Sequence, residues 1–215
     1  MRFTPEILPD FNKAVIETIA QNEVEVTALD QAIGDGDHVI NLQRGIEALF
    51  QQNNDLATLE WTQALQKIGM TLLSTMGGAS GSLFGTLFIS MSKAASANEM
   101  ISRLDFANSF KQGVEAVKKR GKADAGEKTM LDVLIPVAEY MIQDADSSID
   151  LSQYLQNICQ AANEGVESTR NMLATKGRAS YLGDKSIGHI DAGAKTSQLM
   201  ICAIAAVCKN AETSV

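Results

Sequence analysis

The sequence predicts an all-α protein with about eight helices in one domain, and three observations support this fold class. Apolar residues recur at helical spacing along most of the 215-residue chain. No stretch shows the period-2 alternation of β-branched residues that is typical of a strand. Only three prolines occur, and neither a linker nor a change of composition divides the chain. Residues 1–215 are therefore expected to form a single domain.

Four apolar stripes place side chains on one face of a helix, because their members lie three or four residues apart. They are Phe11, Val15, Ile16 and Ile19; Leu65, Ile68, Leu72 and Leu73; Phe106, Phe110, Val114 and Val117; and Leu131, Leu134, Ile135 and Ala138. Two further helices are expected over about 150–174 and about 193–209. The segment 82–97 is apolar or small on nearly all sides until Lys93, which predicts a central, buried helix.

The charge and the cysteines narrow the class of protein. The net charge is −8 and the sequence pI is about 4.8, so neither nucleic acid nor an anionic membrane surface is expected as a partner. A phosphorylated ligand remains compatible with this charge if metal ions and backbone N–H groups provide the positive potential. The odd number of three cysteines favours a reducing compartment. Because the N-terminus lacks an apolar leader and no apolar run reaches membrane-spanning length, a cytoplasmic protein is expected.

Three aspartates, Asp30, Asp35 and Asp37, lie within eight residues beside Gly34 and Gly36. In one interpretation they form a solvated turn in which Asp37 caps the next helix. In the other they bind Mg²⁺, which takes carboxylate and phosphate oxygens as ligands and would relieve the repulsion between the aspartates.

Two other kinds of glycine-containing site do not fit this stretch. A calcium-binding EF-hand loop that began at Asp35 would need glycine at its sixth position and glutamate at its twelfth, where the chain has Ile40 and Ile46. A dinucleotide-binding fingerprint would need a third glycine at the position of Val39.

The second glycine-rich stretch is MGGASG, residues 76–81, directly before the expected buried helix. It is compatible with a tight turn, but it also predicts a phosphate-binding loop, since backbone N–H groups are exposed at the positive end of a helix. It is not a Walker A loop, because no Gly-Lys-Ser/Thr follows.

Two more loops pair glycine with charge, at 120–133 and at 176–194. The second carries Arg178, His189 and Asp191, and a loop of this length without a helix is usually functional or disordered. Taken singly, His189 could be structural and Arg178 a surface charge. If alternate helix ends meet at one rim, however, the four loops bring carboxylates, a glycine loop and an arginine together. That combination is typical of a site for nucleotide phosphates.

These four stretches together resemble a known family. LDQAIGDGDHVINLQRG, GMTLLSTMGGASGSLFGTLF, RGKADAGEKTMLDVLIPV and KGRASYLGDKSIGHIDAGA are similar, in this order, to the nucleotide-binding L subunits of bacterial dihydroxyacetone kinases. The similarity is greatest to the branch that uses phosphoenolpyruvate through the sugar phosphotransferase system. The resemblance implies a closed barrel of eight antiparallel helices with the nucleotide site at one rim.

The resemblance also implies a set of site residues. Two Mg²⁺ ions would be held by three aspartates that match Asp30, Asp35 and Asp37. Positions that contact or enclose the nucleotide match His38, Val39, Ile40, Asn41, Ala79, Ser80, Gly121, Met130, Arg178, Asp191, Ala192 and Gly193. Two of these depart from the family pattern, which usually has glycine at the position of Val39 and proline at that of Ala192.

The reaction implied by the resemblance passes a phosphoryl group between proteins. A phosphohistidine carrier, the M subunit, phosphorylates a tightly bound ADP, and the resulting ATP phosphorylates dihydroxyacetone on a separate K subunit. No catalytic side chain is expected in this chain, because the base would lie on the partner. Two alternatives stay open: an ATP-dependent kinase subunit for a related ketose such as a tetrulose, and a regulatory module that binds a transcriptional regulator. The oligomeric state also stays open, a homodimer included.

Overall fold

The computed structural model describes residues 4–95 and 101–213, and each element within these ranges is an α-helix or a 3-10 helix. This confirms the all-α class. The α-helices are α1 (Leu8–Gln21), α2 (Glu23–Ile33), α3 (His38–Phe50), α4 (Asn53–Ala57), α5 (Trp61–Thr75), α6 (Gly78–Ala94), α7 (Arg103–Gly121), α8 (Leu131–Gln143), α9 (Leu151–Ser168) and α10 (Ala192–Thr213). The 3-10 helices are η1 (Pro5–Ile7), η2 (Thr169–Asn171) and η3 (Arg178–Ser186).

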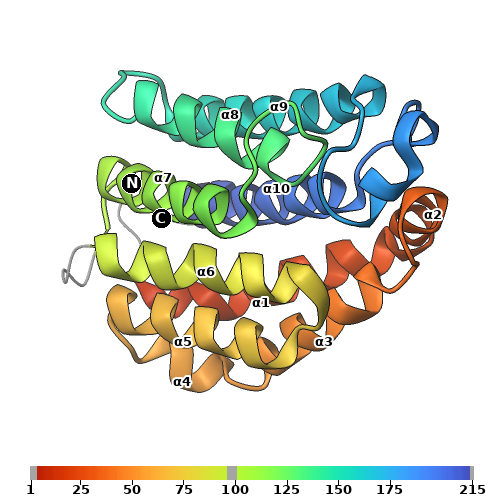
Figure 1. The fold of residues 1–215 in the computed structure, drawn as a ribbon. Coiled ribbons are helices and arrows are strands. Elements are labelled where there is room, and N and C mark those ends of the chain that lie inside the picture. Colours follow the sequence, from red (N-terminus) through yellow and green to blue (C-terminus); the bar gives the residue numbers. More distant parts are fainter. Residues whose placement is uncertain (1–3, 96–100, 214–215) are drawn as a thin grey trace.

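Eight of the helices pack side by side in a closed ring. Each helix contacts the next in the order α1, α3, α5, α6, α7, α8, α9 and α10, and α10 contacts α1. Figure 1 shows these helices along one common direction, with both chain ends at the same end of the ring. Because the chain reverses between successive helices, neighbours are antiparallel, and every second connection lies at the same rim. The shorter α2 extends from the rim opposite the chain ends.

Local sequence explains where the helices begin and end. At the start of α7, the Ser102 hydroxyl accepts a hydrogen bond from the Asp105 N–H while the Asp105 carboxylate accepts one from the Ser102 N–H. This capping box satisfies donors that have no partner within the helix. The same helix ends at Lys122, whose φ of 48° is left-handed. Three basic residues in the last turn of α7 suit the negative end of the helix dipole.

Small residues let α5 and α6 pack closely, and this packing places the glycine-rich connection at the rim. A Cβ added to Gly69 of α5 would lie 2.9 Å from the Gly85 carbonyl oxygen of α6. A Cβ added to Gly81, in the first turn of α6, would lie 1.9 Å from the Met76 carbonyl oxygen. Any larger residue would push α6 away from the connection, since real Cβ atoms do not approach this closely.

The ring encloses an apolar core to which every α-helix contributes. Val39 of α3, Leu87 of α6 and Leu131 of α8 are among its buried side chains. The core contains a cavity of about 230 Å³ with an almost entirely apolar lining. The buried helix expected over 82–97 corresponds to α6, which begins earlier, at Gly78, and has Phe84 and Met91 among its buried residues. Residues 96 and 97 of that segment lie outside the described ranges. Within the described ranges, no helix is long and apolar enough to cross a membrane.

Two sequence predictions about the C-terminal part were wrong in detail. The helix expected over about 150–174 ends at Ser168, and η2 follows it. The loop 176–193, expected without a helix, contains η3, which is kinked at Gly183 with a φ of 54°. Such short 3-10 turns have no sustained apolar period, so periodicity does not reveal them. The helix expected over about 193–209 is longer, since α10 runs to Thr213.

Candidate functional site

A pocket of about 400 Å³ lies at the rim that carries α2. Its walls come from four connections: α2 to α3, α5 to α6, α7 to α8, and α9 to α10. The antiparallel ring brings these connections together because every second connection along the chain lies at the same rim. For the same reason α3, α6, α8 and α10 all begin at this rim. Four helix N-termini, each with a partial positive charge, therefore surround the pocket.

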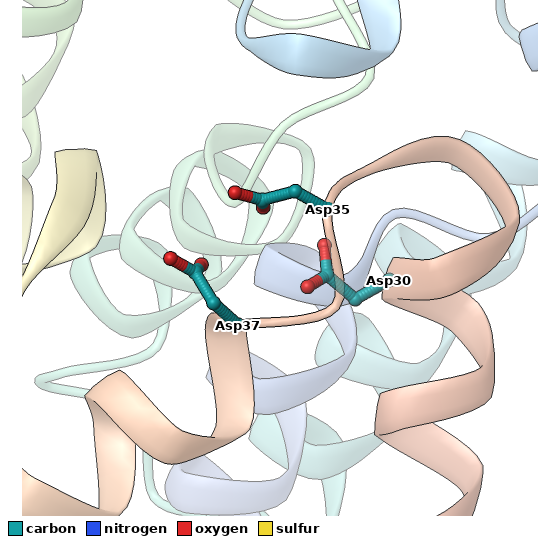
Figure 2. A group of neighbouring side chains, drawn as sticks. All are labelled: Asp30, Asp35 and Asp37. Carbon is teal, nitrogen blue, oxygen red and sulfur yellow. The ribbon is translucent and has the colours of Figure 1, made fainter.

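Three carboxylates stand at the bend between α2 and α3 (Figure 2). Asp30 belongs to the last turn of α2, Asp35 to the connection, and Asp37 precedes the first residue of α3. One carboxylate oxygen from each lies within 4.8 Å of the others. Gly36 between them has a φ of 77°, a conformation that favours glycine. The sequence spacing thus brings the three aspartates together in space.

The aspartates differ in the hydrogen bonds that they accept. The Asp30 carboxylate accepts from the His38 N–H at 3.0 Å, and the Asp30 carbonyl accepts from the Gly34 N–H at 2.5 Å. Asp30 therefore shapes the bend. Asp37 occupies the N-cap position of α3, but its side chain makes no capping hydrogen bond. The interpretation in which Asp37 serves only as a helix cap does not account for its placement.

Arg178, at the start of η3, is a cation that contacts this cluster. Its guanidinium forms an ion pair of 2.8 Å with Asp35. The pair is largely exposed to solvent, so its contribution to folding stability is small. One guanidinium against three carboxylates leaves the group with excess negative charge and with oxygen atoms that suit a hard divalent cation.

His38 links three helices at the wall of the pocket. One ring nitrogen, Nδ1, lies 3.2 Å from the Ser80 hydroxyl of α6, and the other, Nε2, lies 2.9 Å from the Thr196 hydroxyl of α10. Burial lowers the pKa of His38 below its ordinary value, against the opposing charges of Asp30, Asp37 and Asp35. The neutral ring can donate at one nitrogen and accept at the other, which the two hydroxyls satisfy in either tautomer.

The glycine-rich connection forms an open helix start. Gly77 is the N-cap residue of α6, where no side chain caps the first turn, and Gly78 has a φ of 68°. A Cβ added to Gly77 would lie 2.4 Å from the Asn41 side-chain oxygen, so the connection packs directly on α3. The uncapped N–H groups of the first turn, including those of Ala79 and Ser80, can bind an anion.

The opposite wall is more apolar. It includes Leu83 of α6, Gly121 at the end of α7, and Met130 directly before α8. Gly193 lies next to this wall, since a Cβ added there would be 3.8 Å from the Met130 Cβ. This part of the pocket suits a flat apolar group, whereas the aspartates and the α6 N-terminus suit charge.

Asp191 lies deep in the same wall and organises the start of α10. Its carboxylate accepts from the Ala194 N–H at 2.7 Å, and its own N–H donates to the Thr169 hydroxyl at 3.1 Å. Burial raises the pKa of Asp191 to about 6, partly offset by the Ala194 hydrogen bond. An acid with this pKa beside a helix N-terminus is a candidate for ligand binding.

The pocket gathers the predicted residues with two exceptions. Its lining includes Asp30, Asp35, Asp37, His38, Asn41, Ala79, Ser80, Gly121, Met130, Arg178, Asp191, Ala192 and Gly193. The side chains of Val39 and Ile40 lie elsewhere, because successive residues of a helix point in different directions. Val39 is buried in the core, and Ile40 is 59% exposed.

Sequence reasoning missed Lys176 and two other cations that also line the pocket, Lys128 and Arg120. Arg120 donates to the Ser82 hydroxyl of α6 at 2.8 Å. Lys128 is almost completely buried. No periodicity or spacing distinguished any of the three from an ordinary surface lysine or arginine. The only available clue was their place in a glycine-containing stretch.

Comparison with known proteins assigns the family. Residues 32–206 match the model of the DAK2 domain. The chain belongs to the DAK2 domain family. This confirms the resemblance that the four sequence stretches indicated.

Two relatives match the DAK2 chain over most of their length. A protein of Listeria innocua, "PEP-dependent dihydroxyacetone kinase 1, ADP-binding subunit DhaL", is 42% identical over 188 residues, covering 87% of this chain and 89% of that protein. The Escherichia coli K12 protein "PEP-dependent dihydroxyacetone kinase, ADP-binding subunit DhaL" is 40% identical over 184 residues, covering 86% and 88%.

A solved structure shares the fold. The crystal structure of the dihydroxyacetone kinase from C. freundii in complex with AMP-PNP and Mg²⁺ superposes with a TM-score of 0.72 at 22% identity. The match covers 96% of this DAK2 chain and 34% of that chain. At this identity the likeness concerns the fold alone.

Proposed function

We propose that this DAK2 chain is the ADP-binding subunit of a phosphoenolpyruvate-dependent dihydroxyacetone kinase, a phosphoenolpyruvate–glycerone phosphotransferase, and that residues 1–215 act as one nucleotide-binding domain. The observation that carries the proposal is the composition of a single pocket. Three clustered carboxylates, an uncapped helix N-terminus and Arg178 line one part, and an apolar wall lines the other. The names of two relatives that match nearly end to end support it.

Two Mg²⁺ ions would be held by Asp30, Asp35 and Asp37. The donor set fits, because carboxylate oxygens within 4.8 Å of one another are ligands that Mg²⁺ prefers and the group has excess negative charge. When bound, the ions would offset charge on the diphosphate and on the transferred phosphoryl group.

The remaining residues divide between the two parts of the nucleotide. The N–H groups of Ala79 and Ser80, with those of Val39 and Ile40 in the first turn of α3, would bind the phosphates. His38 and Asn41 line this part of the pocket, but their N–H groups already donate to Asp30 and to the Asp37 carbonyl. Arg178 neutralises phosphate charge from η3. The apolar wall would receive the adenine, with Gly121 and Met130 on one side and the segment Asp191–Gly193 on the other. The charged groups of the pocket would thus face the phosphates, and its apolar wall would face the adenine.

The residues of this chain position the nucleotide and neutralise its phosphate charge, and they need not move a proton. Both ring nitrogens of His38 already have hydroxyl partners, so His38 is not free to act as a base. The base that deprotonates dihydroxyacetone belongs to the separate K subunit. The donor that phosphorylates ADP in place is a phosphohistidine carrier, the M subunit. Phosphoryl transfer suits this division, since catalysis rests mainly on positioning and electrostatic stabilisation.

The two alternatives differ in measurable ways. A kinase subunit for a related ketose would exchange its nucleotide freely and use external ATP. A regulatory module would bind nucleotide and a transcriptional regulator without supporting turnover. Binding of a regulator, or association as a homodimer, is compatible with the main proposal as an additional property.

The test is mass spectrometry of nucleotide released from purified protein. We expect ADP to remain through desalting and to be released by EDTA. After mixing with a phosphorylated carrier protein, the released nucleotide should be ATP, and adding a K subunit with dihydroxyacetone should return it to ADP. Protein that retains no nucleotide, but phosphorylates a ketose when external ATP is added, would favour the freely exchanging kinase. Retained ADP that the carrier never converts would favour the regulatory module.

A further inference from the structure

Lys128 is the largest of the side chains that are almost fully buried in the described part of the chain, with 1% exposure. It lies in the connection from α7 to α8, two residues before Met130, and it lines the pocket. Its φ of 60° is left-handed, a conformation that lysine rarely adopts. A buried charge on strained backbone persists only where surrounding contacts hold it.

The Lys128 ammonium reaches across the pocket wall to a different part of the chain. It donates to the carbonyl oxygen of Thr169 at 2.5 Å and to the carbonyl oxygen of His189. The hydroxyl of the same Thr169 accepts from the Asp191 N–H at 3.1 Å. Lys128 therefore ties the Met130 wall to the segment that leads into Asp191 and Gly193.

Lys128 interacts electrostatically with Asp191. Asp191 and Asp132 are the acids that favour the charged ammonium, while Arg170 and burial oppose it and lower the pKa of Lys128. The Asp132 carboxylate already accepts from the Gly126 N–H at 2.5 Å and from the Thr129 N–H at 2.8 Å. Of the two acids, Asp191 has the larger effect on the Lys128 ammonium.

We propose that Lys128 is a positioning residue that sets the width of the slot for the nucleoside, between Met130 and the segment Asp191–Gly193. This inference rests on the proposed nucleotide site. Of the phosphate-binding parts, the aspartates and the start of α6 come from other connections, and Arg178 is held by its ion pair with Asp35 rather than by Lys128. Removing its ammonium should therefore weaken binding of the nucleoside part and leave binding of the phosphates unchanged.

A purely structural cross-link would behave differently. It would lower the stability of the whole rim and weaken every ligand alike. The two roles separate when a nucleotide and a phosphate-only ligand are compared in the same variant. Mg²⁺·ADP and Mg²⁺·pyrophosphate form such a pair, because they share the diphosphate and differ in the nucleoside.

The test uses Lys128→Gly with Lys122→Gly as a matched control. Both lysines lie in the same connection with positive φ, 60° and 48°, so glycine suits the backbone at both. Lys122 is exposed and does not line the pocket. Calorimetric titration of nucleotide-stripped protein should show at least a tenfold rise in the Kd of ADP for Lys128→Gly and less than a threefold rise for pyrophosphate. Lys122→Gly should change neither, and ethylamine should restore part of the ADP affinity of Lys128→Gly.

Lys128→Met, which keeps the apolar stem, provides a second variant and should show the same selectivity. An equal loss of ADP and pyrophosphate binding, ADP binding as in Lys122→Gly, or failure of both Lys128 variants to fold would overturn the proposal. If the unsubstituted protein binds no ADP, the proposed function itself fails. Normal ADP binding by that protein and by both Lys128 variants rejects only the role of Lys128.

Discussion

The two ends of the helix ring differ in their backbone conformation. All residues with positive φ in the described ranges lie in the four connections at the pocket rim: Gly36, Gly78, Lys122, Gly126, Lys128, Gly177, Gly183 and Gly188. At the far end, none of the described residues in the connections 51–60, 95–102 and 144–150 has positive φ. Among the described residues, left-handed backbone is thus confined to the end that carries the carboxylates, where glycines let the connections turn tightly around the pocket.

The helix starts at the two ends differ as well. At the far end, α7 begins with the Ser102 capping box, and α9 begins with Asp150, whose side chain accepts from the Gln153 N–H at 2.7 Å. At the rim, α6 begins at Gly77 without a side-chain cap, whereas the Ala194 N–H of α10 donates to Asp191 and the His38 N–H of α3 donates to Asp30. Two far-end helices thus have capped N-termini, whereas the first turn of α6 at the rim leaves N–H groups for a ligand. This predicts that equivalent substitutions at the two ends affect different properties.

The largest effect is expected for Asp37→Ala at the rim. Loss of one of three clustered carboxylates should raise the Kd of ADP in Mg²⁺ at least hundredfold, equivalent to about 2.7 kcal/mol. The free energy of unfolding of metal-free protein should stay within about 0.5 kcal/mol, since the Asp37 side chain makes no capping hydrogen bond. Calorimetric titration and urea unfolding measure the two quantities. Full ADP affinity in this variant would show that the three aspartates form only a solvated turn.

A second rim substitution, Asp191→Asn, should stabilise the protein without metal and nucleotide. Burial raises the pKa of Asp191 from an ordinary 3.8 to about 6, so the folded state binds this proton more readily than the unfolded state. Stability of the native chain therefore falls as pH rises from about 4 to about 6 and is then level. Asparagine does not ionise, so the variant does not lose stability in this pH range. Its side-chain oxygen can still accept from the Ala194 N–H.

The Asp191→Asn variant should thus gain about 1–2 kcal/mol at pH 7, below the roughly 3 kcal/mol of the full pKa change because solvent in the pocket screens the charge. The gain should vanish at pH 4. Urea unfolding at both pH values measures it, and Asp146→Asn, on the exposed surface between α8 and α9, is the control. A gain that is equal at both pH values would contradict a raised pKa as its cause.

The sequence predicted the helices and the aspartate cluster because both are local patterns, whereas the closed ring was implied only by the family resemblance. Helical spacing identifies stripes such as Leu65–Leu73, and Asp30, Asp35 and Asp37 lie close enough in sequence to meet at one bend. Lys128 escaped prediction because its partners, Thr169 and His189, are 41 and 61 residues away. The side-chain directions of Val39 and Ile40 were missed because a motif match carries no information about which face of α3 points to the pocket.

The smallest effect is expected at the far end, for Asp150→Ala. Its carboxylate satisfies the Gln153 N–H at the start of α9, and loss of such a cap costs about 1 kcal/mol. The Kd of ADP should change less than twofold, because Asp150 lies in the connection from α8 to α9, which does not line the pocket. Asp150→Asn, which keeps an acceptor, should recover most of the lost stability. Thermal and urea unfolding give the stability, and calorimetric titration gives the affinity. If Asp150→Ala weakened ADP binding as strongly as it lowered stability, capping at the far end would be coupled to the rim, and the division of the ring into a stabilising end and a binding end would be wrong.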